Sequence, residues 1–323
     1  MRTRLIFSTP NADFLAESNA DPVFRNTLLS CDMSVADGAP VVWLGRAIGA
    51  PIPMRVAGSS LLDGLICNSG DRGIRIFFFG GDKDMARLAH AALEKREGGA
   101  IAAGWLDPGF VSMDEMSTPD VLAKINEAQP DFLVVALGAK KGHEWIARNA
   151  GRLNATVISH LGAAIGFVAG TTKRSPRLMQ ALGFEWLWRM AMEPRLMRRY
   201  WRDFLFLLRT VFLGLVPVVL SARGGKGSSL CVVERHEGAA RTLSVSGPLL
   251  GSTLSLLGDS LNRDAEGDVT LDISGVTDMD SSAIGYLYYV KYRAGRRVAN
   301  LVCQPGSRAA RLLGFHCARS LFS

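Results

Sequence analysis

Short apolar runs that end in glycine or another small residue recur along the first half of this chain, and they constrain its fold more than any other feature. The clearest run is Ile74–Phe79, which Gly80-Gly81-Asp82 follows at once. Similar runs lie at Leu5–Ser8, Asp131–Leu137 and Thr156–Ser159. Runs of this length predict buried strands, and the segments between them are long enough for helices. This alternation predicts an α/β fold with a mainly parallel sheet.

The ends of the predicted strands carry candidate binding residues. Gly80 and Gly81 follow one strand, and Gly138 follows another. Glycine lets backbone N–H groups approach a phosphate, and the next helix adds its positive N-terminus. Turn chemistry alone also explains these glycines, and the sequence has neither a Walker A nor a G-x-G-x-x-G motif. The strand ends therefore favour an anionic nucleotide ligand without identifying it.

One carboxylate, Asp37, stands at such a strand end. Val35-Ala36 is predicted to end a short buried strand, and Pro40 suits the first turn of a following helix. Ligands of open α/β sheets bind at the carboxyl ends of strands, so Asp37 is a candidate catalytic group. The alternative is that Asp37 only caps the helix through its carboxylate oxygens.

Charge and cysteine content narrow the classes of function. The chain has 323 residues and a net charge of +7, which suggests nucleic acid, a phosphate ligand or a membrane surface as partner. Its five cysteines have no paired spacing, which favours reduced thiols over a disulfide framework or a zinc site. Asp-x-Asp triplets at Asp82–Asp84 and Asp278–Asp280 could hold a divalent metal, but acids also favour helix starts. We predict neither a metal nor a cofactor.

A series of short motifs, in a fixed order and spacing, resembles the WecG/TagA/CpsF glycosyltransferases from residue 5 to about residue 203. The motifs are Thr9-Pro10-Asn11, Ala36–Val42, Arg55-Val56-Ala57-Gly58, Phe79-Gly80-Gly81, Leu137-Gly138, Ala169-Gly170, Lys173-Arg174-Ser175-Pro176, Phe184-Glu185-Trp186 and Glu193-Pro194-Arg195. The resemblance implies a Rossmann-like sheet and an inverting, metal-independent enzyme. Such an enzyme moves an N-acetylmannosamine-type sugar from its UDP donor to an undecaprenyl-diphosphate-linked sugar in polysaccharide assembly.

The resemblance also implies roles for single residues. Asp37 matches the general base, and Thr9 and Asn11 match residues of the pocket. An inverting transfer needs one base to take the proton of the acceptor hydroxyl, and positive groups to stabilise the departing UDP. The further predicted substrate-binding residues of this part of the chain are Arg55, Gly80, Gly81 and Gly138.

The chain departs from the family pattern at two glycines. Gly142 stands where the family usually has glutamine, and Gly166 stands where an aspartate is frequent. His143, beside the first of these, either replaces a lost polar contact or is a solvated residue at a helix start. These departures keep open a second hypothesis, in which a catalytically degenerate transferase fold acts as a regulatory or scaffolding protein.

The sequence pattern of residues 184–220 predicts helices with a basic and an apolar face, and the appendage proper is residues 191–220. The basic residues are Arg195, Arg198, Arg199 and Arg202, at helical spacing. The adjoining apolar residues are Trp201, Phe204, Leu205, Leu208 and Phe212. The pattern predicts a helix on the inner face of the cytoplasmic membrane whose Arg195, Arg199 and Arg202 also reach the donor phosphates. The alternative is an ordinary amphipathic helix with a solvated basic side.

The run Phe204–Leu220 is almost wholly apolar but is shorter than the roughly 20 residues that a bilayer span requires. We therefore predict a peripheral anchor rather than a span, with a buried hairpin as the alternative. Because apolar residues rather than stacking aromatic residues border the arginines, we predict no nucleic-acid partner.

A glycine- and serine-rich linker, Ser221–Ser229, precedes a second α/β pattern. Its predicted strands are Leu230–Glu234, Arg241–Val245, Asp268–Ile273 and Arg297–Cys303, and its predicted helices are Leu249–Leu261, Ser281–Tyr292 and Ser307–Leu313. The run Leu271–Ala283 resembles the central signature of STAS domains, and Ser281 matches the serine that some of them phosphorylate. Ser281 could equally be a simple helix cap. The predicted division is 1–190 for the transferase domain, 191–220 for the appendage, 221–229 for the linker and 230–323 for a STAS-like domain with a protein partner.

Overall fold

The computed structural model of the chain divides into two compact units, and each is described by itself. One unit comprises Met1–Val42 and Met54–Arg202, and the other comprises Trp43–Pro53 and Asp203–Ser323. The structure describes residues 4–47, 50, 52–68, 70, 72–82, 84–96, 99–172, 174–176, 179, 185–192, 197–212, 229–237, 240–262, 269–292 and 298–315.

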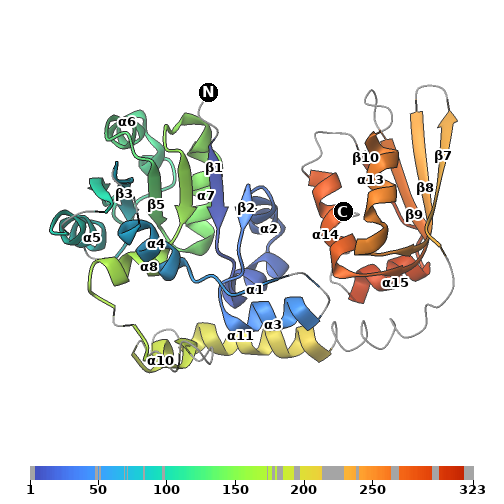
Figure 1. Ribbon diagram of the computed structural model, residues 1–323, viewed down its shortest axis with the longest axis horizontal. Coiled ribbons are helices and arrows are strands. Elements are labelled where there is room, and N and C mark those ends of the chain that lie inside the picture. Colours follow the sequence, from blue (N-terminus) through green and yellow to red (C-terminus); the bar gives the residue numbers. More distant parts are fainter. Residues whose placement is uncertain are drawn as a thin grey trace. The chain divides into compact units, whose positions relative to one another are not determined.

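A six-stranded sheet forms the centre of the first unit, with the strand order β2-β1-β6-β5-β3-β4 (Figure 1). The strands are β1 (Leu5–Ser8), β2 (Met33–Ser34), β3 (Arg75–Gly80), β4 (Ile101–Leu106), β5 (Phe132–Ala136) and β6 (Val157–His160). All of their pairings are parallel. The sequences of β3 and β5 are almost continuously apolar because both faces of these strands are buried. The predicted parallel α/β fold is confirmed.

Helices cover both faces of this sheet (Figure 1). One face packs against α4 (Gly58–Cys67), α5 (Met85–Glu94) and α8 (Gly162–Val168). The other packs against α6 (Pro119–Glu127) and α7 (Ala139–Asn149). The other elements in chain order are α1 (Ala12–Ala20), α2 (Pro22–Leu29), α3 (Ala39–Ala47), η1 (Glu115–Ser117), η2 (Ala150–Arg152), α10 (Glu185–Met192) and α11 (Met197–Thr210).

Alternate residues of β3 enter separate cores on the two faces of the sheet. Ile76 and Phe78 pack with α4, α5 and α8, whereas Phe77 and Phe79 pack with α6 and α7. This alternation follows from the two-residue period of a strand. The ring of Phe79 stacks on Trp145 of α7 with their centroids 4.4 Å apart. Burial of a Phe side chain alone contributes on the order of 2 kcal/mol, so this contact fixes α7 firmly against the sheet.

The second unit contains a four-stranded sheet with the order β10-β9-β8-β7. Its elements are β7 (Cys231–Glu237), β8 (Ala240–Leu249), η6 (Gly251–Thr253), α13 (Leu254–Asn262), β9 (Val269–Met279), α14 (Ser281–Tyr292), β10 (Val298–Val302) and α15 (Arg308–Phe315). β7 and β8 form an antiparallel hairpin, and β8, β9 and β10 pair in parallel. The sheet is therefore mixed.

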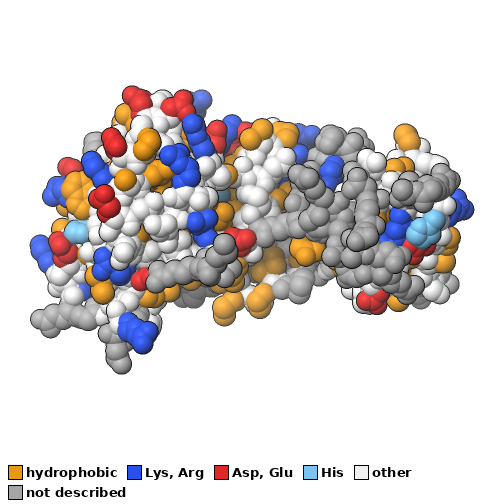
Figure 2. All heavy atoms as spheres, turned by 90° about the horizontal axis from the view of Figure 1, so that it is seen from above, with side chains coloured by type: hydrophobic (Ala, Val, Ile, Leu, Met, Phe, Trp, Pro, Cys, Tyr) orange, Lys and Arg blue, Asp and Glu red, His pale blue; other side chains and the backbone are white. Residues whose placement is uncertain are grey.

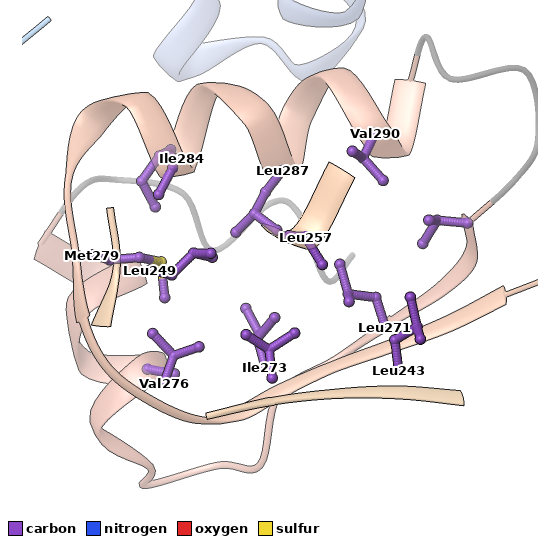
Figure 3. Packing of buried hydrophobic residues seen from close by; sticks show 14 of the residues in the cluster. Leu243, Leu249, Leu257, Leu271, Ile273, Val276, Met279, Ile284, Leu287 and Val290 are labelled. Carbon is purple, nitrogen blue, oxygen red and sulfur yellow. The ribbon is translucent and has the colours of Figure 1, made fainter. Parts of the chain in front are cut away.

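Helix α14 lies over this sheet and directs one side chain per turn into the core (Figure 3). Ile284, Leu287 and Val290 face Leu271 and Ile273 of β9 (Figure 3). The spacing of the three helix residues matches the helical period, which is why the sequence predicted this helix with its correct bounds. The result is a separate apolar core within residues 243–313.

Several predicted elements differ from the observed ones. The strand predicted to end at Val35-Ala36 is instead β2, Met33–Ser34, and both of its residues are exposed because β2 is an edge strand. Ile101–Leu106 was not predicted to be a strand, since Gly104 and two alanines dilute its apolar pattern. Leu249 ends a strand and α13 begins at Leu254, so the helix predicted over Leu249–Leu261 begins too early.

Some sequence predictions fall outside the described residues. They concern Arg195, the linker as far as Ser228 and the part of the apolar run that lies between residues 213 and 220.

Candidate active site

The predicted site residues of the first unit gather at one edge of its sheet. Thr9 follows β1, Asp37 follows β2, Gly80 ends β3, and Gly138 lies just beyond β5. Because every strand runs in the same direction, these positions lie at the carboxyl ends of the strands. α10 lies on the side of the sheet to which the strand arrows point (Figure 1). The topology therefore brings the sequence candidates to one edge.

Asp37 is held there by bonds to two other segments. Its backbone N–H donates to the carbonyl of Pro10 at 2.9 Å, and its Oδ2 accepts from the backbone N–H of Gly58 at 3.4 Å. The N–H of Val56 donates to the carbonyl of Ala36 at 3.0 Å, which keeps the chain before α4 beside the aspartate. Gly58 is the first residue of α4, so the half-buried carboxylate lies at a helix N-terminus, where negative charge is favoured.

Thr9 and Asn11 border the same place. Thr9 is buried, and a Cβ on Gly58 would lie 3.3 Å from its Oγ1 and 2.8 Å from Cδ2 of Leu161. Gly58 thus allows β1, α4 and the end of β6 to meet closely. Asn11 caps α1, because its Oδ1 accepts from the N–H of Phe14 at 3.1 Å. Its Nδ2 group is the part of the side chain that a ligand could bind.

The glycines at the strand ends have different surroundings. A Cβ on Gly80 would lie 2.9 Å from the carbonyl oxygen of Ala136, so this glycine allows β3 and β5 to pack closely. Gly81 has a φ of +107°, which side chains disfavour. Gly138 has a φ of +81° and open space around its Cβ position at the start of α7. Of the three, Gly138 is the one that leaves its backbone most open to a ligand.

Two buried histidines, which the sequence did not single out together, lie beneath this edge. His143 Nδ1 bonds the carbonyl of Ala139 at 2.9 Å, and its Nε2 lies 3.0 Å from the Ser8 hydroxyl. A carbonyl can only accept, so Nδ1 carries the proton and Ser8 donates to Nε2. Burial lowers the pKa of His143, which favours the neutral ring. The interpretation of His143 as a solvated residue is therefore wrong.

His160 ends β6 and packs against His143 with ring centroids 5.2 Å apart. Neither of its ring nitrogens has a hydrogen-bond partner among the described residues. Burial, followed by the nearby His143, lowers the pKa of His160 from 6.5 to about 3. A Cβ on Gly142 would lie 2.3 Å from Cδ2 of His160, so the imidazole occupies the space that a side chain at position 142 would need. No apolar or glycine pattern in the sequence predicts this pairing.

The arginines of the appendage and the site loop have specific partners. Arg55 Nη1 lies 3.2 Å from Oε2 of Glu185, the first residue of α10. Arg202 of α11 pairs with Asp13 and, at 3.4 Å, with Glu17, both on α1. The Arg199 guanidinium lies 5.2 Å from the ring centroid of Tyr200. Arg55 and Arg202 thus join α10 and the first turns of α11 to the rest of the first unit.

Several apolar side chains of α11, and Phe212 just beyond it, are exposed. The exposed fraction is 63% for Trp201, 49% for Phe204, 48% for Leu205, 43% for Leu208 and 61% for Phe212. Within the described part of the chain, no helix combines the length and apolar character that a membrane span needs. On the face drawn in Figure 2, the described Lys and Arg side chains are interspersed with Asp and Glu rather than gathered in one field.

Two other predictions concern metals and phosphorylation. Among the described residues, no group of three or more His, Cys, Asp or Glu side chains could hold a metal ion. Ser281 is the first residue of α14, and Asp280 caps this helix by accepting from the N–H of Ala283 at 2.8 Å. The phosphorylation of Ser281 stays a prediction.

Comparison of the sequence with known proteins identifies the family of this chain. The sequence model of the glycosyl transferase WecG/TagA/CpsF family matches residues 1–216, and that of the STAS domain matches residues 231–316. The chain belongs to the WecG/TagA/CpsF glycosyltransferase family. It is therefore a glycosyltransferase, and its second unit carries a STAS domain, as the sequence motifs predicted.

Two relatives of this glycosyltransferase are N-acetylglucosaminyldiphosphoundecaprenol N-acetyl-beta-D-mannosaminyltransferases. The protein from Bacillus spizizenii is 28% identical over 191 residues, which cover 59% of this chain and 72% of the relative. The protein from Staphylococcus aureus strain MW2 is 24% identical over 189 residues, or 58% of this chain and 72% of the relative. Both matches fall short of the whole chain, and each covers most of the relative.

Proposed function

We propose that this glycosyltransferase moves an N-acetylmannosamine-type sugar from a UDP donor to a polyprenyl-diphosphate-linked sugar in cell-surface polysaccharide assembly. The names of the relatives support this pair of sugars. The observation that carries the proposal is the position of Asp37, a half-buried carboxylate at the carboxyl edge of a parallel sheet and beside the first N–H of α4. Ligands of open α/β sheets bind at this edge.

The reaction is a single displacement with inversion at the anomeric carbon. Asp37 takes the proton of the acceptor hydroxyl while the acceptor oxygen forms its bond to that carbon, and the bond to UDP breaks on the opposite side. Thr9 and the Nδ2 group of Asn11 are the polar contacts beside the base. They would orient the sugar or the acceptor.

The departing diphosphate needs positive charge, and this chain offers it as arginine and backbone N–H groups. Arg55 directly precedes Val56, whose N–H donates to the carbonyl of Ala36. Arg199 and Arg202 lie in the first turns of α11. Gly138 offers an open backbone at the start of α7, and Gly80 and Gly81 lie at the neighbouring strand end. We propose that these groups bind the diphosphate without a metal, with Arg195 as a further candidate outside the described residues.

The exposed apolar face of α11 supports docking to the inner face of the cytoplasmic membrane. An amphipathic helix of this kind lies in the interface, with its apolar side chains in the lipid and its arginines at the anionic headgroups. Replacement of Phe204, Leu205 and Leu208 by Ser should release the protein from anionic liposomes and spare UDP binding. Liposome binding equal to that of the parent would contradict this role.

We propose that the STAS domain binds a protein partner. Ser281, at the start of α14, is its candidate phosphorylation site.

The direct test is a screen of UDP-sugars against a polyprenyl-diphosphate-linked N-acetylglucosamine acceptor. We expect product with UDP-N-acetylmannosamine, with inverted configuration, and equal rates in the presence of EDTA. Rates abolished by EDTA and restored by magnesium or manganese would contradict the metal-independent mechanism. Donor binding without transfer to any acceptor would instead favour a degenerate transferase with a regulatory role.

A further inference from the structure

The ion pair between Arg55 and Glu185 joins two parts of the chain that are 130 residues apart. Arg55 belongs to the segment that leads into α4, and Glu185 begins α10. Both side chains are half-buried, with 24% and 19% of their surface exposed. A pair that is partly withdrawn from water is screened less than a surface pair. It therefore has more effect on structure than an exposed pair.

Arg55 is closely coupled to the candidate base. The next residue, Val56, donates its N–H to Ala36, the residue before Asp37, and Gly58 donates to the Asp37 carboxylate itself. A movement of Arg55 therefore shifts the segment that supports Asp37. Among the described residues, Glu185 is the ionic partner of Arg55, and it contacts one of the guanidinium nitrogens. Within the described ranges no other bond of this guanidinium is seen, and its remaining N–H groups are donors that a phosphate could accept.

Glu185 is equally coupled to the appendage. As the first residue of α10 it lies at the positive end of the helix, where its charge is favoured. The adjacent Trp186 contacts Tyr200 of α11 with ring centroids 6.3 Å apart, and Tyr200 in turn lies under the guanidinium of Arg199. Hydrogen bonds, one ion pair, a ring contact and the short stretches of chain between them thus link Asp37 through Arg55 and Glu185 to the basic helix.

We infer that Glu185 is a positioning residue of the transfer reaction, which orients Arg55 toward the donor diphosphate and makes the site depend on the docking of α10. The inference rests on the proposed function, because it requires a diphosphate at this edge. Glu185 touches neither donor nor acceptor. It holds one end of the guanidinium fork so that the other end points at the site, and it ties the fork to the membrane-facing helix.

The test uses the full chain and UDP as the probe, with affinity measured by calorimetry and transfer kinetics measured separately. Glu185→Gln keeps the shape and removes the charge, and it should weaken UDP binding by about tenfold, the size of one charge-assisted hydrogen bond. Glu185→Asp should restore part of this loss. Asp114→Asn is the matched control, because it removes an exposed ion pair with Arg148. Arg148 lies in the last turn of α7, at the opposite end of that helix from Gly138. It should leave UDP binding unchanged.

A double-mutant cycle separates positioning from general stabilisation. If Glu185 acts through Arg55, then Glu185→Ala should add no further loss of UDP affinity in an Arg55→Ala background. Additive losses, or a Glu185→Gln variant that binds UDP like the parent, would overturn the inference and leave the proposed function standing. A parent protein that binds no UDP would overturn the donor assignment and this inference with it. Thermal unfolding of each variant shows whether the fold is intact, and Glu185→Asp gives the answer if Glu185→Gln does not fold.

Discussion

The two α/β units of this chain use their buried polar groups differently. In the first unit Ser8, Thr9, His143 and His160 are buried at or beneath the carboxyl edge of the sheet. Within residues 231–316 the described buried polar residues are Arg241 and Ser260, and Nη2 of Arg241 donates to the carbonyl of Ser260 at 2.6 Å. The first unit thus places buried polar groups at the edge that carries its candidate site, whereas the second unit bonds its two to each other inside the fold.

The same contrast holds for one aspartate in each unit. Asp37 and Asp280 both follow a strand and accept backbone N–H groups at a helix start. Asp280 accepts two bonds of 2.8 Å, from Gly251 and Ala283, whereas the bond from Gly58 to Asp37 is 3.4 Å long. The sequence places both aspartates at a strand end that precedes a helix. In the structure Asp280 caps the helix that directly follows it, whereas Asp37 accepts from the first N–H of α4, a helix that begins 21 residues further along the chain. Five predictions test this comparison.

The largest effect is expected at Asp37. Asp37→Asn keeps the side-chain shape and removes the proton acceptor, so transfer should fall by about 10²–10⁴-fold, the usual contribution of a general base. UDP-sugar binding, measured by calorimetry, should be largely kept. Asp32→Asn is the matched control, because Asp32 accepts the N–H of Ile6 at 2.7 Å in the same part of the sheet and has no proposed part in the reaction. Turnover of Asp37→Asn at the parent rate would leave Asp37 with a capping role only.

The next effect concerns the core of the STAS domain. Leu271 is fully buried among β9, α13 and α14 (Figure 3), so Leu271→Ala should destabilise this domain by about 2–5 kcal/mol. If the two units fold independently, urea unfolding should show two transitions, and only that of the STAS domain should move. The transfer rate should stay at the parent value.

Truncation gives a second measure of that independence. A chain that ends after Gly225 should keep a folded, active transferase, and residues from about Ser228 should fold alone. A single shared unfolding transition, or loss of transfer in the Leu271→Ala variant or the truncated chain, would show that the two units depend on each other. The linker at Ser221–Ser229 motivates this division.

The third effect is the acid sensitivity of the first unit. The pKa of His160 is about 3 in the folded protein and about 6.5 in the unfolded chain, because burial opposes its charge. As the pH falls below about 6.5, the unfolded chain takes up a proton that the folded protein does not. The free energy of unfolding is therefore independent of His160 above about pH 6.5 and decreases as the pH falls toward 3. The expected slope is about 1.4 kcal/mol per pH unit for one such group.

His160→Phe should remove the His160 part of this slope and leave the part that the buried His143 contributes, which urea unfolding between pH 7 and pH 4.5 measures for the transition of the first unit. His236 of β7 lies in the second unit, so His236→Gln is the control and should leave the pH dependence of the first unit's transition unchanged. Equal slopes in His160→Phe and the parent would mean that the buried imidazole is not the acid-sensitive group.

The sequence predicted those features that depend on local pattern. Strand β1, helix α14 and the gathering of Asp37, Thr9 and Gly138 at one edge follow from short apolar runs, helical spacing and strand direction. The His143–His160 contact could not be predicted, because His160 of β6 fills the space that a side chain at Gly142 of α7 would occupy. The Arg55–Glu185 pair was missed for a similar reason, since its partners are far apart in the sequence. Local patterns predict the framework, and packing between distant segments decides the finer geometry of the site.

The smallest effect is expected at Asp280, the counterpart of Asp37 in the STAS domain. Asp280 caps α14 through Ala283 and also holds Gly251 at the start of η6, so its carboxylate fixes two helix starts against each other. Asp280→Ala should therefore lower the stability of the STAS domain by about 1 kcal/mol, the usual cost of losing an N-cap. Transfer should be unchanged, because nothing in the proposed reaction uses this residue. Urea unfolding of the second transition gives the stability, and the transfer assay gives the rate. A transfer rate that falls together with the stability would mean that the STAS domain acts on the catalytic edge. Asp280 would then affect the reaction as Asp37 does, and the two aspartates could no longer be assigned separate roles as a cap and a base.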